Sequence, residues 1–317
     1  MKVFIELALL MVLIATTGCQ PPPEPLRIVS SPWPGYEPLY LARDLGYLQE
    51  SSVRITELPS SNLNMEAFSN GSTDLSTLTL DETLTLLARG QKLRILLVMD
   101  VSNGADAVVA KPEIQSLMEL KGKRVGMENI PLGAYILSRV LDMTGLQASD
   151  MEIIPMPEDK HEKAYQQGKI DAAITMEPYK TRLTQAGARV LLDSSRIPDE
   201  IFDLIVVRED IYQSRREELC AFARQWFRTL DYVQANQQQA YAQMGKRLGM
   251  DAEAFRSVMG GLKVPSREDN QRMLGGEIPT LLAPARRLSD IMKAGQMLPG
   301  EADIAASIDS SFTSCMQ

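Results

Sequence analysis

Short apolar runs alternate with segments of helical periodicity between residues 26 and 98. The runs short enough for strands are residues 27–30, 53–58, 75–78 and 93–98. The helical patterns between them are residues 38–45, 65–68 and 82–88. Pro38 near the start of the first helical pattern and Gly46 at its end match the residue preferences of helix termini. The alternation predicts a parallel sheet flanked by helices.

The same order of elements returns about 97 residues further along the chain. The segment Phe68-x-x-Gly71-x-x-Asp74 recurs as Tyr165-x-x-Gly168-x-x-Asp171, and Gly90 recurs as Gly187. Gly71 and Gly168 are expected to cap helices, because a left-handed backbone is most accessible without a Cβ atom. A doubled unit of this length predicts two similar lobes rather than a solenoid.

Two matching apolar runs, residues 106–111 and 203–208, each begin with an aspartate. We interpret them as crossover strands that carry the chain from lobe I to lobe II and back. The C-terminal third, from Ser214, has apolar residues at helical spacing and is expected to cover lobe I. The predicted organisation is a signal peptide at 1–18, a proline-rich tether at 19–25, lobe I at 26–104 and 209–317, and lobe II with both crossover strands at 105–208.

The first twenty residues indicate export. Lys2 precedes an apolar stretch at 4–15, which is too short to span a hydrocarbon core of roughly 30 Å and is typical of a signal peptide. The following Thr16-Thr17-Gly18-Cys19 resembles the lipobox of bacterial lipoproteins, although Thr16 stands where that motif usually has Leu. The resemblance implies a diacylated Cys19 and a periplasmic protein anchored to a bacterial membrane, with secretion of an unmodified chain as the alternative.

Composition narrows the classes of function. The chain of 317 residues has 33 Lys and Arg against 41 Asp and Glu, and its net charge of −8 disfavours nucleic-acid binding. One histidine and three cysteines disfavour a zinc site built from imidazoles or thiolates, and we expect neither a metal nor a cofactor. Cys220 lies in an apolar periodic run and Cys315 near the C-terminus, and the sequence leaves open whether they form a disulfide.

Several segments resemble the periplasmic substrate-binding proteins of ABC importers, in the group that binds nitrate, sulfonates, taurine and thiamine-pyrimidine precursors. The segments are residues 33–42, 46–48, 71–75, 120–126 and 168–173. The resemblance implies a type II two-lobe α/β fold and a monomer that delivers a small-molecule ligand to permease and ATPase subunits. The pyrimidine-synthesising enzymes of this fold use a histidine and a cysteine cluster that this chain lacks, so we expect a binding protein and no enzyme.

Ligands of open α/β sheets bind beyond the carboxyl ends of the strands, next to helix N-termini. This rule selects Ser31, Trp33, Tyr36, Thr79, Asp81, Asn103, Asp106, Glu128, Asn129, Thr175 and Glu177, with Ser30, Gly35, Glu82 and Ser102 beside them. The set holds many carboxylates, two aromatic rings and no Arg or Lys. It favours an amine or an aminopyrimidine-like ring over nitrate or a sulfonate.

Each candidate also has a structural explanation. Asp81 fits the N-cap of the following helix, Trp33 fits loop packing, and Glu128 and Glu177 fit solvated or helix-capping positions. His161 lies in a charged run, which predicts a solvated helix face. A two-lobe binder that reports its ligand to a membrane receptor or kinase is the alternative to transport.

Overall fold

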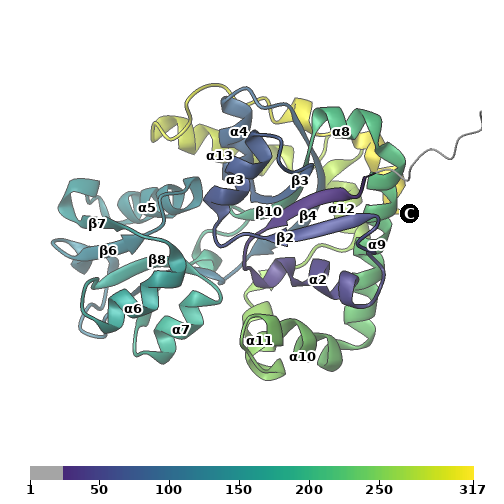
Figure 1. Cartoon of the computed structure of the whole chain (residues 1–317). Helices are drawn as coiled ribbons and strands as arrows, with labels where there is room; N and C mark the ends of the chain where they lie inside the picture. The colour runs from purple at the N-terminus through teal and green to yellow at the C-terminus, as the bar shows by residue number, and fades with distance from the viewer. Residues whose placement is uncertain (1–23) are drawn as a thin grey trace, which may run out of the picture.

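Two β-sheets with the same strand arrangement divide the molecule into two lobes (Figure 1). The structure is a computed structural model that describes residues 24–317. The predicted signal peptide, Cys19 and most of the predicted tether lie outside the described residues. No helix within residues 24–317 is long and apolar enough to cross a membrane.

The sheet of lobe I has six strands in the order β11-β4-β10-β3-β1-β2. Its strands are β1 (Leu26–Ser30), β2 (Val53–Glu57), β3 (Leu75–Thr79), β4 (Leu93–Ser102), β10 (Phe202–Arg208) and β11 (Leu262–Lys263). Strand β1 pairs in parallel with β2 and β3, as the strand–helix alternation predicts. Strand β10 lies antiparallel between β3 and β4, so the sheet is mixed rather than wholly parallel.

The sheet of lobe II has five strands in the order β7-β6-β8-β5-β9. Its strands are β5 (Asp106–Ala110), β6 (Arg124–Met127), β7 (Glu152–Pro155), β8 (Ala172–Met176) and β9 (Arg189–Asp193). Strand β6 pairs in parallel with β7 and β8, and β5 lies antiparallel between β8 and β9. Lobe II therefore repeats the arrangement of lobe I, which confirms the predicted two-lobe α/β fold.

The chain crosses between the lobes twice, from β4 into β5 and from β9 into β10. Each crossing strand inserts antiparallel into the sheet of the lobe that it enters. The prediction that residues 203–208 belong to lobe II is therefore wrong for this strand. The main chain of β10 pairs with β3 and β4, and its apolar side chains are buried in lobe I. Backbone pairing and side-chain burial therefore both place β10 in lobe I.

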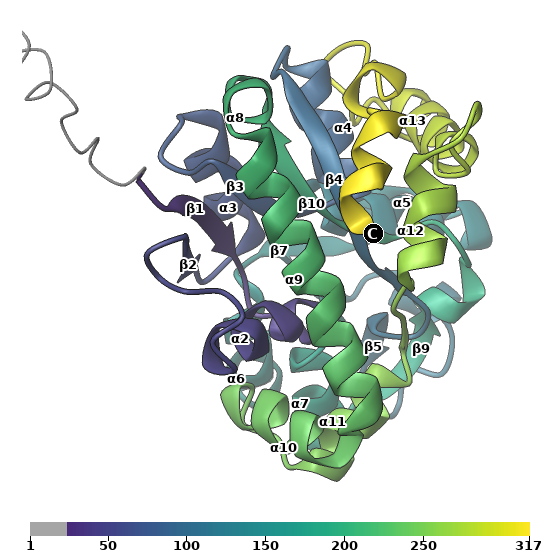
Figure 2. The same cartoon turned by 90° about the vertical axis from the view of Figure 1, so that its right-hand side faces the viewer.

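Helices cover the two sheets. Those of lobe II are α5 (Pro131–Thr144), α6 (His161–Gln166) and α7 (Tyr179–Gln185). Those of lobe I are α2 (Glu37–Asp44), α3 (Ser61–Ser69), α4 (Leu80–Ala88), α8 (Glu209–Ser214), α9 (Arg216–Ala235), α10 (Gln237–Arg247), α11 (Ala252–Met259), α12 (Arg267–Leu274) and α13 (Leu282–Ala294). Figure 2 shows the long α9 lying across lobe I. Phe222 and Trp226 of this helix are buried, as the helical spacing predicts.

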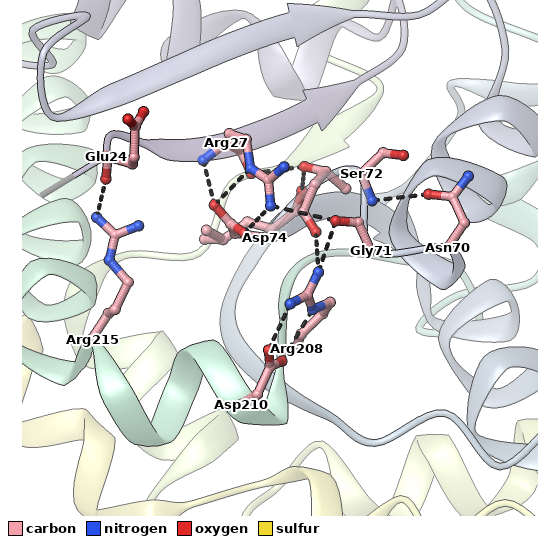
Figure 3. Close-up of polar contacts among 11 residues, drawn as sticks. Glu24, Arg27, Asn70, Gly71, Ser72, Asp74, Arg208, Asp210 and Arg215 are labelled. Atoms are coloured by element: carbon pink, nitrogen blue, oxygen red, sulfur yellow. Dashed lines mark hydrogen bonds and ion pairs between the residues drawn. The ribbon is translucent and has the colours of Figure 1, made fainter.

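The sequence repeat has a physical basis in one ion pair per lobe. Asp74 accepts hydrogen bonds from the backbone N–H of Arg27 (3.0 Å) and from its Nη2 (2.6 Å), as Figure 3 shows. Asp171 accepts the same bonds from Arg124, at 3.2 and 2.8 Å. Asp74 thus fastens β1 to the start of β3, and Asp171 fastens β6 to the start of β8. Gly71 has φ +78°, the left-handed conformation expected of it.

His161 does not lie on a solvated helix face. Its side chain is fully buried at the start of α6, and burial lowers its pKa to about 4. Of its charged neighbours, residues 158–160 form the preceding 3-10 helix, where Glu158 is also buried, and Glu162 and Lys163 follow on α6. His161 is therefore a neutral packing residue at physiological pH.

The structure pairs Cys220 on α9 with Cys315 in the C-terminal 3-10 segment Ser310–Met316, across 95 residues of sequence. The disulfide fastens the end of the chain to the long helix that covers lobe I. A cross-link over a segment of this length restricts the unfolded chain strongly.

Replacing both cysteines by serine is expected to lower the free energy of unfolding by about 2–4 kcal/mol, because the unfolded chain regains conformational freedom. Urea unfolding followed by circular dichroism measures the change. Wild-type protein treated with dithiothreitol should lose the same stability, whereas the double variant should not respond to the reductant. Unfolding of the wild type that is insensitive to reductant would contradict the disulfide.

Candidate functional site

A cavity lies where the two lobes meet. Lobe I contributes Ser31, Trp33, Tyr36, Ser61, Thr79, Glu82 and Asp203 to its lining. Lobe II contributes Asp106, Ile130, Leu132 and Met176. The lobe I side is therefore polar and acidic with two aromatic rings, and the lobe II side is mainly apolar with one carboxylate.

The loop after β1 brings its aromatic residues against a buried aspartate of β4. The indole Nε1 of Trp33 donates a hydrogen bond to Oδ2 of Asp100 at 3.0 Å. Gly35 lies so close to this carboxylate that a Cβ atom there would stand 1.8 Å from Oδ2. A glycine is thus required for the loop to reach Asp100, and the Trp33 ring is fixed at the cavity wall rather than packed between loops.

Asp100 and Asp203 form a pair of carboxyl groups on neighbouring strands. They stand opposite each other in the antiparallel register of β4 and β10. The hydroxyl of Tyr36 donates a hydrogen bond to Oδ1 of Asp203. Burial raises the pKa of Asp100 to about 7, and burial together with the charge of Asp100 raises the pKa of Asp203 well above its usual range. At neutral pH the pair therefore retains a proton.

Asp106 is the carboxylate that lobe II presents to the cavity. It is 2% exposed, and among the described residues neither of its side-chain oxygens accepts a hydrogen bond. Burial raises its pKa to about 6, and the positive charge of Lys180 opposes the rise. Lys180 itself donates to the carbonyl of Gly104 at 2.6 Å, with its Nζ 3.7 Å from Glu177.

The repeat extends into the cavity. Asp106 and Asp203 are 97 residues apart, as are Thr79 and Met176. In lobe I Asp203 stands opposite Thr79, and in lobe II Asp106 stands opposite Met176. All four line the cavity. The two inserted strands therefore deliver equivalent aspartates, one from each sheet, to the same space.

The start of α4 is held by Glu82 and not by Asp81. One carboxylate oxygen of Glu82 accepts from the backbone N–H of Thr79 at 3.0 Å, and the other accepts from the hydroxyl of Ser61 at 2.5 Å. Thr79 is accordingly the N-cap of the helix. The alternative that Asp81 is the N-cap is wrong: Asp81 lies one residue inside the helix, buried behind the lining, and burial raises its pKa well above the usual range.

Five further candidates lie outside the lining of the cavity. Asn103 is half-buried in the first crossing, where its backbone N–H donates to the carbonyl of Gly261 at 2.8 Å. Glu177 caps α7 by accepting from the backbone N–H of Thr181 at 3.1 Å, as its structural explanation proposed. Glu128 is half-buried, Asn129 is exposed, and Thr175 is buried on β8.

The residues named beside the candidates have different roles. Ser30 pairs with the hydroxyl of Tyr40 at 2.6 Å and fastens β1 to α2 within lobe I. Ser102 pairs with the hydroxyl of Ser194 at 2.7 Å and fastens the crossing region. Burial, followed by the charge of Glu82, raises the pKa of Glu128 to about 6. Glu82 belongs to lobe I and Glu128 to lobe II, so the acidity of the cavity continues across the boundary between the lobes.

Six residues that shape the site were not among the sequence candidates: Ser61, Asp100, Ile130, Leu132, Met176 and Asp203. Asp203 carried a signal, because it begins one of the two matching apolar runs. Asp100 interrupts the otherwise apolar β4 and could have been noticed for that reason. The apolar lining residues gave no signal, since a cavity wall and a core have the same sequence pattern.

The lining of the cavity contains carboxyl groups but no Arg, Lys or His. Within residues 24–317 no group of three or more His, Cys, Asp or Glu is arranged to hold a metal ion. The site can accept hydrogen bonds from a donor-rich ligand, balance a positive charge and contact an aromatic or planar group.

The raised pKa values predict that the ligand-free protein is more stable at pH 5 than at pH 8. Asp100, Asp106 and Glu128 bind protons more tightly when folded than when unfolded, so unfolding free energy falls as pH rises through about 6 to 7. Thermal melts across this range measure the effect.

The variant Asp100→Asn should be about 1–3 kcal/mol more stable than the wild type at pH 8 and should show a weaker pH dependence. Asp142→Asn is the matched control, because Asp142 is 59% exposed on α5 and does not line the cavity. A wild-type melting temperature that rises steadily from pH 5 to pH 8 would contradict the prediction.

Residues 33–240 match the family model described as NMT1/THI5 like. A protein of Escherichia coli (strain K12) named for aliphatic sulfonate binding is 25% identical over 274 residues, which cover 82% of this chain and 83% of the relative.

Two solved structures are similar over almost their whole length. The alkanesulfonate-binding protein SsuA from Xanthomonas axonopodis pv. citri, bound to MOPS, has a TM-score of 0.75 at 17% identity and covers 92% of this chain and 99% of that chain. A ligand-binding component of an ABC-type import system from Staphylococcus aureus, with zinc bound, has a TM-score of 0.76 at 11% identity and covers 92% and 98%. The two-lobe architecture is that of periplasmic binding proteins.

Proposed function

We propose, because the chain belongs to the NMT1/THI5-like family, that it is an extracytoplasmic solute-binding protein that closes around a small ligand and delivers it to an ABC importer. The two lobes meet at a cavity and are joined by two crossings, an arrangement that permits hinge closure. Permease and ATPase subunits are the partners that this function requires.

The ligand that the cavity supports best is a small nitrogen-bearing cation or hydrogen-bond donor, such as an amine or an aminopyrimidine-like ring. One observation carries this proposal: three buried carboxyl groups line the cavity, a fourth lies directly behind them, and the lining has no basic side chain. A buried carboxylate without a partner is strongly unfavourable, and a cationic ligand would supply the missing partner. The rings of Trp33 and Tyr36 would contact the same positive charge.

A sulfonate is the second candidate, because similar proteins are named for sulfonate binding. An anionic ligand would lie against Glu82, Asp106 and Asp203, and every one of these groups would have to be protonated to accept it. The two candidates therefore predict opposite pH dependence: acid should weaken the binding of a cation and strengthen the binding of a sulfonate.

Isothermal titration of the mature protein with 4-aminopyrimidine, benzylamine, taurine, MOPS and nitrate tests the ligand class. We expect binding of at least one nitrogen base, weakened about tenfold to a hundredfold in Asp203→Asn because a buried charge partner is lost. Asp142→Asn should bind as the wild type does. Binding of taurine or MOPS with no binding of the bases would overturn the cationic ligand while leaving the solute-binding function in place.

We also propose that Cys19 carries a lipid that anchors the protein to a bacterial membrane on its periplasmic side. The Pro-rich residues after Cys19 would then separate the lipid from the folded lobes. Growth of the host with an alkyne-labelled palmitate should label the wild type and not Cys19→Ser, and the variant should leave the membrane fraction. Equal labelling of both proteins would contradict lipidation at this residue.

A further inference from the structure

We propose that Asp106 makes the cavity selective for a ligand with a planar fork of two N–H donors, an amidinium or guanidinium group, and that Asp203 accepts a third N–H from the same group. This inference rests on the proposed cationic ligand and specifies its chemical class. It follows from the acceptor atoms that the cavity leaves free.

The three carboxyl groups that line the cavity differ in how many oxygens are free. Both oxygens of Glu82 are occupied, by Ser61 and by the backbone N–H of Thr79. Asp203 receives the Tyr36 hydroxyl on Oδ1, and its Oδ2 is buried without a partner among the described residues. The two oxygens of Asp106 are both buried without a partner within residues 24–317. The acceptors left without a donor are therefore both oxygens of Asp106 and one oxygen of Asp203.

A carboxylate with two free oxygens matches one kind of donor best. Amidinium and guanidinium groups present two parallel N–H bonds in one plane, which fit the two oxygens of a carboxylate simultaneously. An ammonium group directs its donors tetrahedrally and acts more as a point charge, and a quaternary ammonium has no N–H at all. Only the planar fork satisfies both oxygens of Asp106 with good geometry.

The remaining walls of the cavity suit a planar cation with a carbon substituent. The rings of Trp33 and Tyr36 lie 6.4 Å apart at 59°, so they can contact the face and the edge of a flat group. Ile130, Leu132 and Met176 form the apolar wall on the lobe II side and would accept the substituent. The nearest basic residue, Lys180, donates to Gly104 and does not fill the acceptors of Asp106.

The two aspartates also belong to different lobes, which links recognition to closure. Asp106 lies on β5 in the sheet of lobe II, and Asp203 lies on β10 in the sheet of lobe I. Their like charges oppose each other's ionisation, and the charge of Asp106 contributes to the raised pKa of Asp203. A guanidinium bound to both would replace this repulsion with attraction across the cleft and favour the closed state.

Matched phenyl compounds provide the test: benzamidine, benzylamine, benzyltrimethylammonium and phenylguanidine, titrated calorimetrically into the mature wild type. We expect benzamidine to bind at least about tenfold more tightly than benzylamine, and the quaternary compound to bind weakest. Phenylguanidine, which adds a further N–H, should bind at least as tightly as benzamidine.

Four variants assign the preference to residues. Asp106→Asn replaces one acceptor oxygen with an NH₂ group and should remove the preference for benzamidine over benzylamine. Asp203→Asn should preserve that preference and remove any advantage of phenylguanidine. Asp142→Asn should behave as the wild type. Asp106→Glu keeps the charge but displaces the carboxylate, and it provides a second test if Asp106→Asn does not fold.

The outcomes separate this inference from the proposed function. Equal affinity for benzamidine and benzylamine, or a preference that survives in Asp106→Asn, would overturn the fork at Asp106 and leave a cationic ligand intact. Binding of taurine or MOPS with no binding of any cation would overturn the cationic ligand and this inference together. Failure of benzamidine and phenylguanidine at millimolar concentration, with benzylamine bound, would also overturn the inference.

Discussion

The site depends on the burial of like charges where two lobes meet. Asp100 and Asp203 face each other across neighbouring strands, and Asp106 approaches from the other lobe. Such a cluster is unfavourable in a low-dielectric interior unless protons or a bound cation neutralise it. The indole of Trp33 and the hydroxyl of Tyr36 stabilise one oxygen each, and Gly35 permits the loop to approach closely enough to do so. The aromatic wall of the cavity is thus positioned by the carboxyl groups.

The duplicated fold explains why the acidic groups converge. Each lobe receives one strand that follows a crossing. Strand β10 is inserted antiparallel beside β3 in lobe I, and β5 is inserted antiparallel beside β8 in lobe II. Because the two insertions are equivalent, Asp106 and Asp203 reach the cleft from opposite sheets at matching positions. A ligand that contacts both aspartates contacts both lobes, so binding and closure share the same atoms. The crossings themselves are held by Ser102, Ser194 and Lys180.

The fold is shared with periplasmic binding proteins, whereas the charge of the cavity is a property of this chain. A two-lobe scaffold can carry ligands of either sign, because the residues at the cleft are exchanged without altering the sheets. Proteins named for sulfonate binding have the same architecture. The acidic lining is the physical reason for proposing a cationic ligand here.

The sequence by itself determined the two lobes, the crossing strands and the C-terminal cover of lobe I, because apolar periodicity and the repeat of Gly71 and Asp74 act locally. It also selected six of the residues that line the cavity, since strand ends can be read from the pattern. The tertiary structure decided the sheet to which β10 belongs, the burial of His161 and the Cys220–Cys315 disulfide. It alone placed Asp100 opposite Asp203 and left the oxygens of Asp106 free. Strand order, register and hydrogen-bond partners are set by contacts between residues far apart in the sequence, and a linear pattern does not contain them.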